Sequence, residues 1–548
     1  MPHRHSPLPS SASQDGQAWA VAAVVLLAII AAGSATRLIG LDHLPIWHDE
    51  VFTLVRVFGY PSDAWNTLFS GQLLTPQEVL RFQQPDPAFG WGDTLTALAE
   101  HPEHAPLYYL LGRLATGLPL DPVTTLRGTS AAFGLLLPLA AFWLMRALFG
   151  RGPSAWVAAA LIAVSPLHLL YAQEARQYAL WTLLVLAASA ALLRALRTNR
   201  AGDWWLYGGF LTLGLYSHLL FALVLPVHAA YGWLVGSAAS GSLLRPTGLP
   251  IRRWLTAVAV AAILFLPWII VLLSGIDSAA NHTEWMERAI GAPRNLLSWG
   301  RHITRAFLDI SPAQEPPLAT LALLLPLAAA VGYYLWRAPR PQRWLLVLLT
   351  LAYLGVVLGP DLFLGGSRSL HVRYGLPALL GIQLMVAWSI GAALQRGRGA
   401  RVIGATSLAL LLMFGLWSQW RIQQAERWWS KQFSADNIDV ARLVNAFERP
   451  LVAVSPSGVA EGELISLAYH LDDHVRIWSQ SGTGGAVSLP AGFDGIVMLL
   501  PSGELRNAVG PDRHLEPIGD SWQWFLVRPN TSPEGADGPP RATGTPTP

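Results

Sequence analysis

The sequence contains no cysteine and has few charged residues. The absence of cysteine excludes disulfides, thiolate nucleophiles and thiolate metal ligands. Charged residues make up 13% of the 548 residues, about half the fraction of an ordinary soluble domain. Lys431 is the only lysine, and the arginines are scattered along a chain whose formal net charge is +3. This pattern argues against nucleic acid as a partner. Catalysis must therefore use carboxylates, His, Arg or Tyr.

Long apolar runs are the main feature that is present. Apolar residues make up 52% of the chain, with runs at 18–35, 132–148, 254–273 and 402–416. We interpret each run as the apolar centre of a helix that crosses a hydrocarbon core about 30 Å thick. The first run has a basic start but no small-residue cleavage site before Arg37, so we interpret it as a retained helix rather than a signal peptide. The sequence thus predicts a multi-pass membrane protein.

Arginine clusters predict how the chain threads the membrane. Cytoplasmic loops collect arginine, and five clusters recur, beginning at Arg146, Arg194, Arg245, Arg337 and Arg396. If all of them are cytoplasmic, the chain is an all-α bundle of about eleven transmembrane helices. The predicted segments are a cytoplasmic tail (1–17) and a membrane domain (18–419) with an external loop at 37–125.

The apolar stretch 106–118 is predicted to lie on the outer surface as a helix. If it crossed, the cluster at Arg146 would move outside. Its Tyr108 and Tyr109 suit the membrane interface, because each ring has an apolar body and a polar edge. We therefore expect external surface helices between the first two spans.

After residue 420 the composition becomes that of a soluble domain. Strand-like and helix-like segments alternate, which predicts a small external α/β domain over 420–527. The expected strands are 451–454, 475–478, 495–500 and 522–527, and the expected helices are 461–471 and 503–509. The segment 528–548 is rich in Pro, Gly, Thr and Ala, so we expect a disordered tail.

The densest polar cluster follows the first apolar run. It contains Arg37, the segment Trp47-His48-Asp49-Glu50, and Arg56, with a short apolar helix expected at 51–58. In a structural interpretation, Asp49 caps this helix and Glu50 stabilises its N-terminal dipole. In a catalytic interpretation, a carboxylate at the outer surface acts as a general base for an acceptor hydroxyl. The two interpretations are compatible.

Two further clusters lie at predicted outer ends of spans. The first is 173–178, where a surface ion pair between Glu174 and Arg176 is the structural alternative. The second is 368–374, with two arginines in an external loop, against the positive-inside bias. Arginine suits phosphate oxygens, although contact with lipid headgroups is the alternative. Arg127 is a weaker candidate of the same kind.

The segment His101-Pro102-Glu103-His104 has the composition of a metal site. Its spacing is not diagnostic, and an exposed polar loop is the preferred interpretation. The sequence therefore gives no certain cofactor and leaves a divalent metal open.

These segments together resemble the GT-C superfamily of polytopic glycosyltransferases. The resemblance is to the family 39-like branch of protein O-mannosyltransferases, aminoarabinose transferases and lipopolysaccharide-core transferases, and it covers roughly 18–400. The motifs that carry it are Arg37-Leu38-Ile39-Gly40-Leu41, Trp47-His48-Asp49-Glu50, Glu103-His104-Ala105-Pro106-Leu107-Tyr108-Tyr109, Tyr171-Ala172-Gln173-Glu174-Ala175-Arg176-Gln177-Tyr178 and Arg373-Tyr374-Gly375-Leu376-Pro377. Ala105 stands where the family usually has proline.

The resemblance implies an inverting transfer of sugar from a polyprenyl-phosphate donor. The acceptor would be a lipid, glycan or protein at the outer face of an inner (plasma) membrane, among membrane lipids. The family's catalytic base is the first acidic residue of the loop, which falls on Asp49, with Glu50 beside it. From the clusters and the resemblance together, the predicted substrate-binding residues are Arg37, Arg56, His104, Arg127, Glu174, Arg176, Tyr178, Arg368, His371, Arg373 and Tyr374.

Two other classes of protein remain as alternatives. A transporter or flippase of lipid-linked saccharides tends to keep polar groups near the bilayer midplane and to have repeated halves. A receptor would use its spans only as an anchor for the C-terminal domain. The charges of this chain lie at the ends of its spans and the sequence has no internal repeat, so both alternatives are less favoured.

Overall fold

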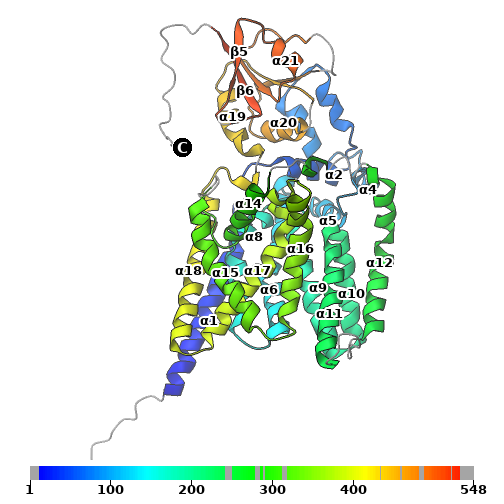
Figure 1. Cartoon of the computed structure of the whole chain (residues 1–548). Coiled ribbons are helices and arrows are strands. Elements are labelled where there is room, and N and C mark those ends of the chain that lie inside the picture. The colour runs from blue at the N-terminus through cyan, green and yellow to red at the C-terminus, as the bar shows by residue number, and fades with distance from the viewer. Residues whose placement is uncertain are drawn as a thin grey trace, which may run out of the picture. The chain divides into compact units, whose positions relative to one another are not determined.

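The computed structural model describes residues 11–240, 250–277, 284–287, 291–311, 317–431, 433–456, 459–480, 487–519 and 521–530. The chain divides into two compact units. One combines Met1–Ser62 with Gln83–Gln432, and the other combines Asp63–Phe82 with Phe433–Pro548. Each unit is described by itself below, with the elements labelled in Figure 1.

The first unit is built from long apolar helices that run side by side (Figure 1). Eight helical segments of the described chain are long and apolar enough to cross a membrane, and a bent pair makes up to nine. The chain is thus a multi-pass helical membrane protein. The helices are α1 (Ser11–Ala35), α6 (Pro122–Phe149), α7 (Pro153–Val164), α8 (Pro166–Ala172), α9 (Tyr178–Thr198), α10 (Ala201–Ser217), α11 (Val224–Ser240), α12 (Ile251–Ser274), α15 (Pro317–Arg337), α16 (Arg343–Phe363), α17 (Leu376–Leu394) and α18 (Arg398–Gln423).

The finer count of eleven spans stays a prediction. It requires α1 and α10 to cross in addition to the eight helices and the bent pair. The apolar helical stretch that includes the end of α1 is Ala23–Leu38, too short for the criterion that the eight helices meet, and α10 has 17 residues. Seventeen residues give a helix of about 26 Å, slightly less than the hydrocarbon thickness.

The bent pair is α7 and α8, which meet at an angle of 58°. Pro166 starts α8 and has no N–H to continue the ladder of α7, so carbonyl groups at the end of α7 are left without helical partners. The buried guanidinium of Arg37 donates to the carbonyl oxygens of Ile162 and Ala163 at 2.8 and 3.0 Å. The bend directs the chain into the loop 173–177, which helps to form the candidate site.

Short helices fill the segment between α1 and α6. Within the first unit they are α2 (His48–Phe58), α4 (Trp91–Ala99) and α5 (Leu107–Ala115). Gly59, with φ 81°, ends α2 in the left-handed conformation, which an L side chain adopts with strain. The stretch 106–118 forms α5, which has only nine residues and is not a span. The expectation of interfacial tyrosines was wrong, because Tyr108 and Tyr109 are fully buried.

The second unit contains a mixed six-stranded sheet in the order β1-β3-β2-β4-β6-β5. Strands β3, β2 and β4 are parallel, and the remaining pairs are antiparallel. Leu451, Ala453, Ile496 and Met498 form an apolar core on one sheet face together with Leu505 of α21. The strands are β1 (Leu73–Leu74), β2 (Pro450–Val454), β3 (Arg476–Ser479), β4 (Gly495–Leu499), β5 (Arg513–Pro517) and β6 (Trp524–Pro529), and the helices α3 (Pro76–Leu80), α19 (Asn437–Asn445), α20 (Ala460–Ala468) and α21 (Gly503–Asn507).

The four strands and two helices expected after residue 450 all occur within a few residues of their expected positions. Strand β1 was not expected, because it comes from the first loop and pairs with β3 some 400 residues further along the chain (Leu73 with Trp478). Strand β6 runs to Pro529, two residues into the segment expected to be a tail. Residues 531–548 and residues 1–10 lie outside the described parts, whereas 11–17 begin α1.

Candidate active site

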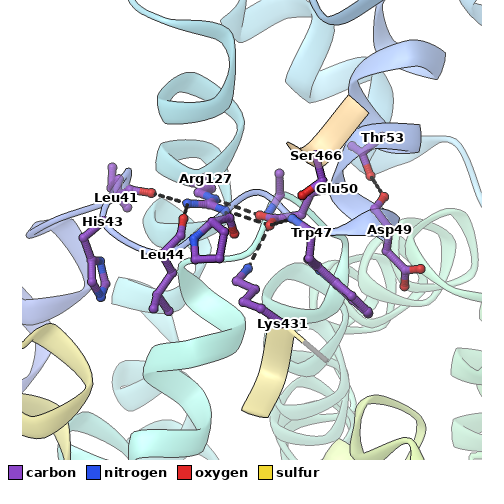
Figure 2. Close-up of polar contacts among 12 residues, drawn as sticks. Leu41, His43, Leu44, Trp47, Asp49, Glu50, Thr53, Arg127, Lys431 and Ser466 are labelled. Atoms are coloured by element: carbon purple, nitrogen blue, oxygen red, sulfur yellow. Dashed lines mark hydrogen bonds and ion pairs between the residues drawn. The ribbon is translucent and has the colours of Figure 1, made fainter. Parts of the chain in front are cut away.

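The candidate site is built at the N-terminus of α2. The N-cap residue is Trp47, and the Glu50 carboxylate accepts the Trp47 backbone N–H at 3.2 Å. Asp49 is the second residue of the helix, so the expectation that Asp49 is the cap was wrong. The expectation that Glu50 stabilises the helix start agrees with this geometry. Figure 2 shows the carboxylates of Asp49 and Glu50 pointing in different directions.

Glu50 is fully buried and its two oxygens are saturated. Arg127 of α6 binds it in a bidentate fork, with Nε and Nη2 each 2.8 Å from a carboxylate oxygen. Lys431 Nζ and the Ala175 backbone N–H also donate to it at 2.8 Å (Figure 2). Glu50 thus ties the first loop to α6, to the loop before α9 and to the segment after α18. The charges of Arg127 and Lys431 outweigh burial and lower the pKa of Glu50 to about 2.

Asp49 lies between two arginines and remains partly open, with 19% of its side chain exposed. Its Oδ2 is 3.3 Å from Arg373 Nη1 and 3.8 Å from Arg176 Nη2. Burial raises the pKa of Asp49, but the positive charges of Arg373 and Arg176 outweigh it and lower the pKa to about 2. Asp49 is therefore an ionised carboxylate that remains partly exposed, unlike Glu50.

Arg176 comes from the loop before α9 and is held by α2 and α5. Its Nη1 donates to the Asp49 carbonyl at 3.2 Å and to the hydroxyls of Thr53 and Tyr109 at 3.3 and 3.4 Å. Arg176 and Glu174 are 5% and 1% exposed. The alternative of a surface ion pair between them was therefore wrong, because both are buried and the ion pair of Arg176 is made to Asp49.

Glu174 is a buried carboxyl of a different kind. Its Oε1 has no hydrogen-bond partner among the described residues. Burial raises its pKa, and the charges of Glu50 and Asp49 add to this, whereas Lys431 opposes it, so the pKa reaches about 7. Glu174 can thus gain or lose a proton near neutral pH, unlike Asp49.

Several other predicted residues surround Asp49. Arg373 lies over the rings of Trp47 and Tyr374, each with its carbon Cζ 5.3 Å from the centroid. Arg373 Nε has no hydrogen-bond partner in the described part of the chain. Burial and the charge of Arg373 lower the pKa of His371 to about 3, so His371 is neutral at neutral pH.

A second group of predicted residues lies on the α5 side of Arg176. Arg176 stands over the Tyr178 ring at 5.9 Å, and the His104 ring packs 5.9 Å from that of Tyr109. Arg56 lies two turns after Asp49 on α2, is 7% exposed, and donates to the Phe52 carbonyl at 3.3 Å. With Arg176 and Arg373, the positive charges near Asp49 outnumber its single negative charge.

Three predicted arginines have their donors engaged elsewhere. Arg127 donates to Glu50 and to the backbone carbonyls of Leu41, Leu44 and Pro45. Arg37 is engaged with the end of α7, as described above. Arg368 pairs with Asp361 at 3.4 Å and with Glu287 at 3.7 Å. Carboxylates of the protein therefore hold Arg368 in its loop.

The most important residue that the sequence did not reveal is Lys431. It is 2% exposed and reaches Glu50 from the short segment after α18. That segment is anchored by Trp428 and Trp429, whose ring N–H groups donate to the buried Asp309 at 3.0 and 2.7 Å. The only signal in the sequence is that Lys431 is the single lysine of the chain.

The segment around His101 does not form a metal centre. Glu103 Oε1 is 3.5 Å from His101 and 3.7 Å from His104. Among the residues that the structure describes, no group of three or more His, Cys, Asp or Glu side chains is arranged to hold a metal ion.

Comparisons with known proteins agree with this architecture. Residues 102–271 match the model of the dolichyl-phosphate-mannose-protein mannosyltransferase family. A search of curated protein sequences gave no significant match. The match confirms, over this part of the chain, the predicted resemblance to membrane glycosyltransferases of the GT-C class.

Solved structures define the fold further. The chain is similar to ArnT from Cupriavidus metallidurans in the apo state (TM-score 0.53, 12% identity, 92% of this chain and 98% of that chain). It is also similar to ArnT bound to undecaprenyl phosphate (TM-score 0.51, 13% identity, 92% and 97%). An oligosaccharyltransferase from Archaeoglobus fulgidus matches with a TM-score of 0.49 and 14% identity over 83% of this chain and 64% of that chain. The fold is thus ArnT-like.

Proposed function

We propose that the chain transfers a sugar from a polyprenyl-phosphate donor to an acceptor hydroxyl at the outer face of the membrane, with Asp49 as the general base. The observation that carries this proposal is the position of Asp49, ionised and 19% exposed between Arg373 and Arg176. Glu50, its neighbour, is buried and has both oxygens occupied. Only one of the two adjacent carboxylates is thus available to a substrate.

The reaction needs one base and stabilisation of one leaving group. Asp49 accepts the proton of the acceptor hydroxyl, and the acceptor oxygen forms a bond to the anomeric carbon. The bond from that carbon to the phosphate oxygen breaks, and the polyprenyl phosphate leaves with the electron pair. Arg373 and Arg176 stabilise the charge on the phosphate. A single displacement inverts the anomeric carbon, and a phosphate leaving group needs no general acid.

Binding of the donor also adjusts the basicity of Asp49. With a pKa of about 2 beside Arg373 and Arg176, Asp49 by itself is a weak base. A donor phosphate would compete with Asp49 for Arg373 and Arg176 and would bring negative charge close to it. Both effects raise the pKa of Asp49 toward the working pH, so the base becomes stronger when the donor is bound.

The remaining predicted residues divide by their contacts. Arg127 and Arg37 are assigned structural roles, because their donors are engaged with Glu50 and with backbone carbonyls. Arg368 stabilises its own loop through Asp361 and Glu287. Arg373, whose Nη1 is 3.3 Å from Asp49 and whose Nε has no hydrogen-bond partner among the described residues, is the best candidate for the donor phosphate. The similarity to an ArnT that binds undecaprenyl phosphate supports this assignment.

The test is turnover of a labelled polyprenyl-phosphate sugar by purified Asp49→Asn protein. We expect transfer to fall roughly 10²- to 10⁴-fold, because the amide cannot accept the proton, while the protein remains folded and still binds the donor. The control is Asp42→Asn, which changes an exposed carboxylate of the same loop. Near-normal transfer by Asp49→Asn would remove the catalytic assignment. A transporter would move lipid-linked saccharide without releasing sugar from its phosphate, so sugar release distinguishes the two classes.

A further inference from the structure

A separate cavity of about 360 Å³ lies in the first unit beside the C-terminal end of α2. Its lining residues include Phe58 at the end of α2, Asp86, Trp91 at the start of α4, and Arg113 and Thr116 of the α5 region. The volume falls within the range of roughly 300 to 1,000 Å³ that is typical of small-molecule sites. None of these residues belongs to the cluster around Asp49.

Arg113 is fixed in place rather than mobile. Its Nη1 donates to the Val57 carbonyl and the Thr94 hydroxyl, both at 2.8 Å, and its Nη2 donates to the Phe89 carbonyl at 2.6 Å. The guanidinium carbon lies 5.7 Å from the centroid of the Trp91 ring. Trp91 nevertheless remains 49% exposed, so about half of this residue stays accessible beside a guanidinium that hydrogen bonds hold in place.

Asp86 supplies the second polar group of the cavity. Its Oδ1 accepts the Ala88 backbone N–H at 2.9 Å, which orients the carboxylate, and the residue is exposed. A flat aromatic face with a carboxylate and a guanidinium beside it matches the chemistry of a pyranose. The C–H face of the sugar packs on the ring, and its hydroxyls donate to the carboxylate and accept from the guanidinium.

The cavity lies far enough from Asp49 that only an acceptor longer than one sugar unit could contact both. Asp49 and Phe58 lie at opposite ends of α2, and the nine helical steps from one to the other correspond to about 14 Å along the helix axis. A group in the cavity would therefore be remote from the reacting hydroxyl. Because α2 is one rigid element, the cavity and Asp49 are held at a fixed separation.

We propose that this cavity binds a saccharide unit of the acceptor, remote from the hydroxyl that receives the sugar. The proposal rests on the proposed function, since it assigns the acceptor a glycan or glycolipid character. The competing outcome is that Trp91 is an interfacial anchor in the lipid headgroups, as many tryptophans of membrane proteins are.

The first experiment measures transfer from a labelled polyprenyl-phosphate sugar to a glycolipid and glycan extract of membranes that lack the protein. Trp91→Ala should raise the half-saturating amount of extract roughly tenfold, as expected for loss of one aromatic contact, with the donor KM unchanged. Trp91→Phe should recover most of the loss. The matched control is Trp233→Ala, which removes a tryptophan of similar exposure (47%) on α11. Equal effects of Trp91→Ala and Trp233→Ala would overturn the proposal.

A second experiment does not depend on catalysis. The full-length protein is labelled with 5-fluorotryptophan, and the Trp91 resonance is assigned by its absence in Trp91→Phe. Methyl mannoside, mannobiose and cellobiose are then titrated in, and at least one should shift this resonance in the Asp49→Asn protein as well as in the native one. If no saccharide shifts it while a spin-labelled lipid broadens it, Trp91 is an anchor and the inference is wrong. If a saccharide shifts the Trp91 resonance but the native protein transfers no sugar, the proposed function is wrong and the saccharide site remains supported.

Discussion

Two adjacent carboxylates have opposite environments in this protein. Asp49 is reachable and sits between two arginines, whereas Glu50 is enclosed by Arg127 and Lys431. The motif in the sequence predicted the pair, because consecutive residues at a helix start are easily recognised. It could not predict which carboxylate is open, because the partners of Glu50 come from residues 77 and 381 positions away.

Glu50→Gln should lower stability more than it lowers the chemical step. Removing one member of a buried ion pair leaves uncompensated charge and typically costs about 3–5 kcal/mol, and here both Arg127 and Lys431 would lose their partner. We expect a larger fall in melting temperature for Glu50→Gln than for Asp49→Asn, because Asp49 is partly exposed whereas Glu50 is fully buried. Thermal unfolding of both variants in the same detergent checks this. The reverse order would mean that the buried cluster does not hold the loop.

Glu174 should make stability depend on pH near neutrality. Its folded pKa of about 7 lies above the ordinary value of 4.5. The contribution of Glu174 to stability is thus fully present below about pH 4.5 and is lost as pH rises through 7, where burial opposes the charged form. Glu174→Gln cannot ionise, so its melting temperature relative to the native protein should rise between pH 5 and pH 8. A difference that stays constant with pH would show that Glu174 is not protonated in the fold.

At the scale of elements, the loop between α16 and α17 carries two arginines with different partners. Arg373 reaches Asp49, whereas Arg368 pairs with Asp361 and Glu287. Arg373→Ala should raise the donor KM roughly 10- to 100-fold, the effect of losing a hydrogen bond to a charged group. Arg368→Ala should leave the donor KM near its native value. Transfer kinetics at varied donor concentration test this. An equal rise in donor KM in the two variants would mean that Arg368 also binds the donor phosphate.

Elements with local signals were predictable, and elements made by distant pairing were not. Strands β2, β3, β4 and β6 were expected from their short apolar runs. Strand β1 has only two residues, and β5 is mostly exposed, so neither carries a periodic pattern. The break in the helix could be located from Pro166. The sequence could not predict that Arg37 donates hydrogen bonds to the carbonyl oxygens at the end of α7.

At the scale of the whole molecule, the apolar runs indicate that the protein spans a membrane, and the arginine clusters predict its orientation in that membrane. That orientation puts the N-terminal end of α2 and the sheet outside and the loop before α18 inside. Because the chain has no cysteine, a single introduced cysteine reports on one position only. Cysteines at Gln84 and Glu448, both exposed, should react with an impermeant thiol reagent in intact cells, and one at Gly399 should not. Protection at Glu448 would contradict an external C-terminal unit.

The number of spans can be tested at α10 with the same method. If α10 crosses, the turn before it is cytoplasmic and the turn after it is external, so Gly202→Cys should be protected and Ala222→Cys labelled; both positions are exposed. We expect α10 to cross, because its length of about 26 Å falls only slightly short of the core and a small mismatch costs fractions of a kcal/mol per Å. Both cysteines should react after permeabilisation, which controls for accessibility. Labelling of the two positions from the same side would mean that α10 does not cross, and the arginines at 194–200 and 245–253 would then lie on opposite sides of the membrane.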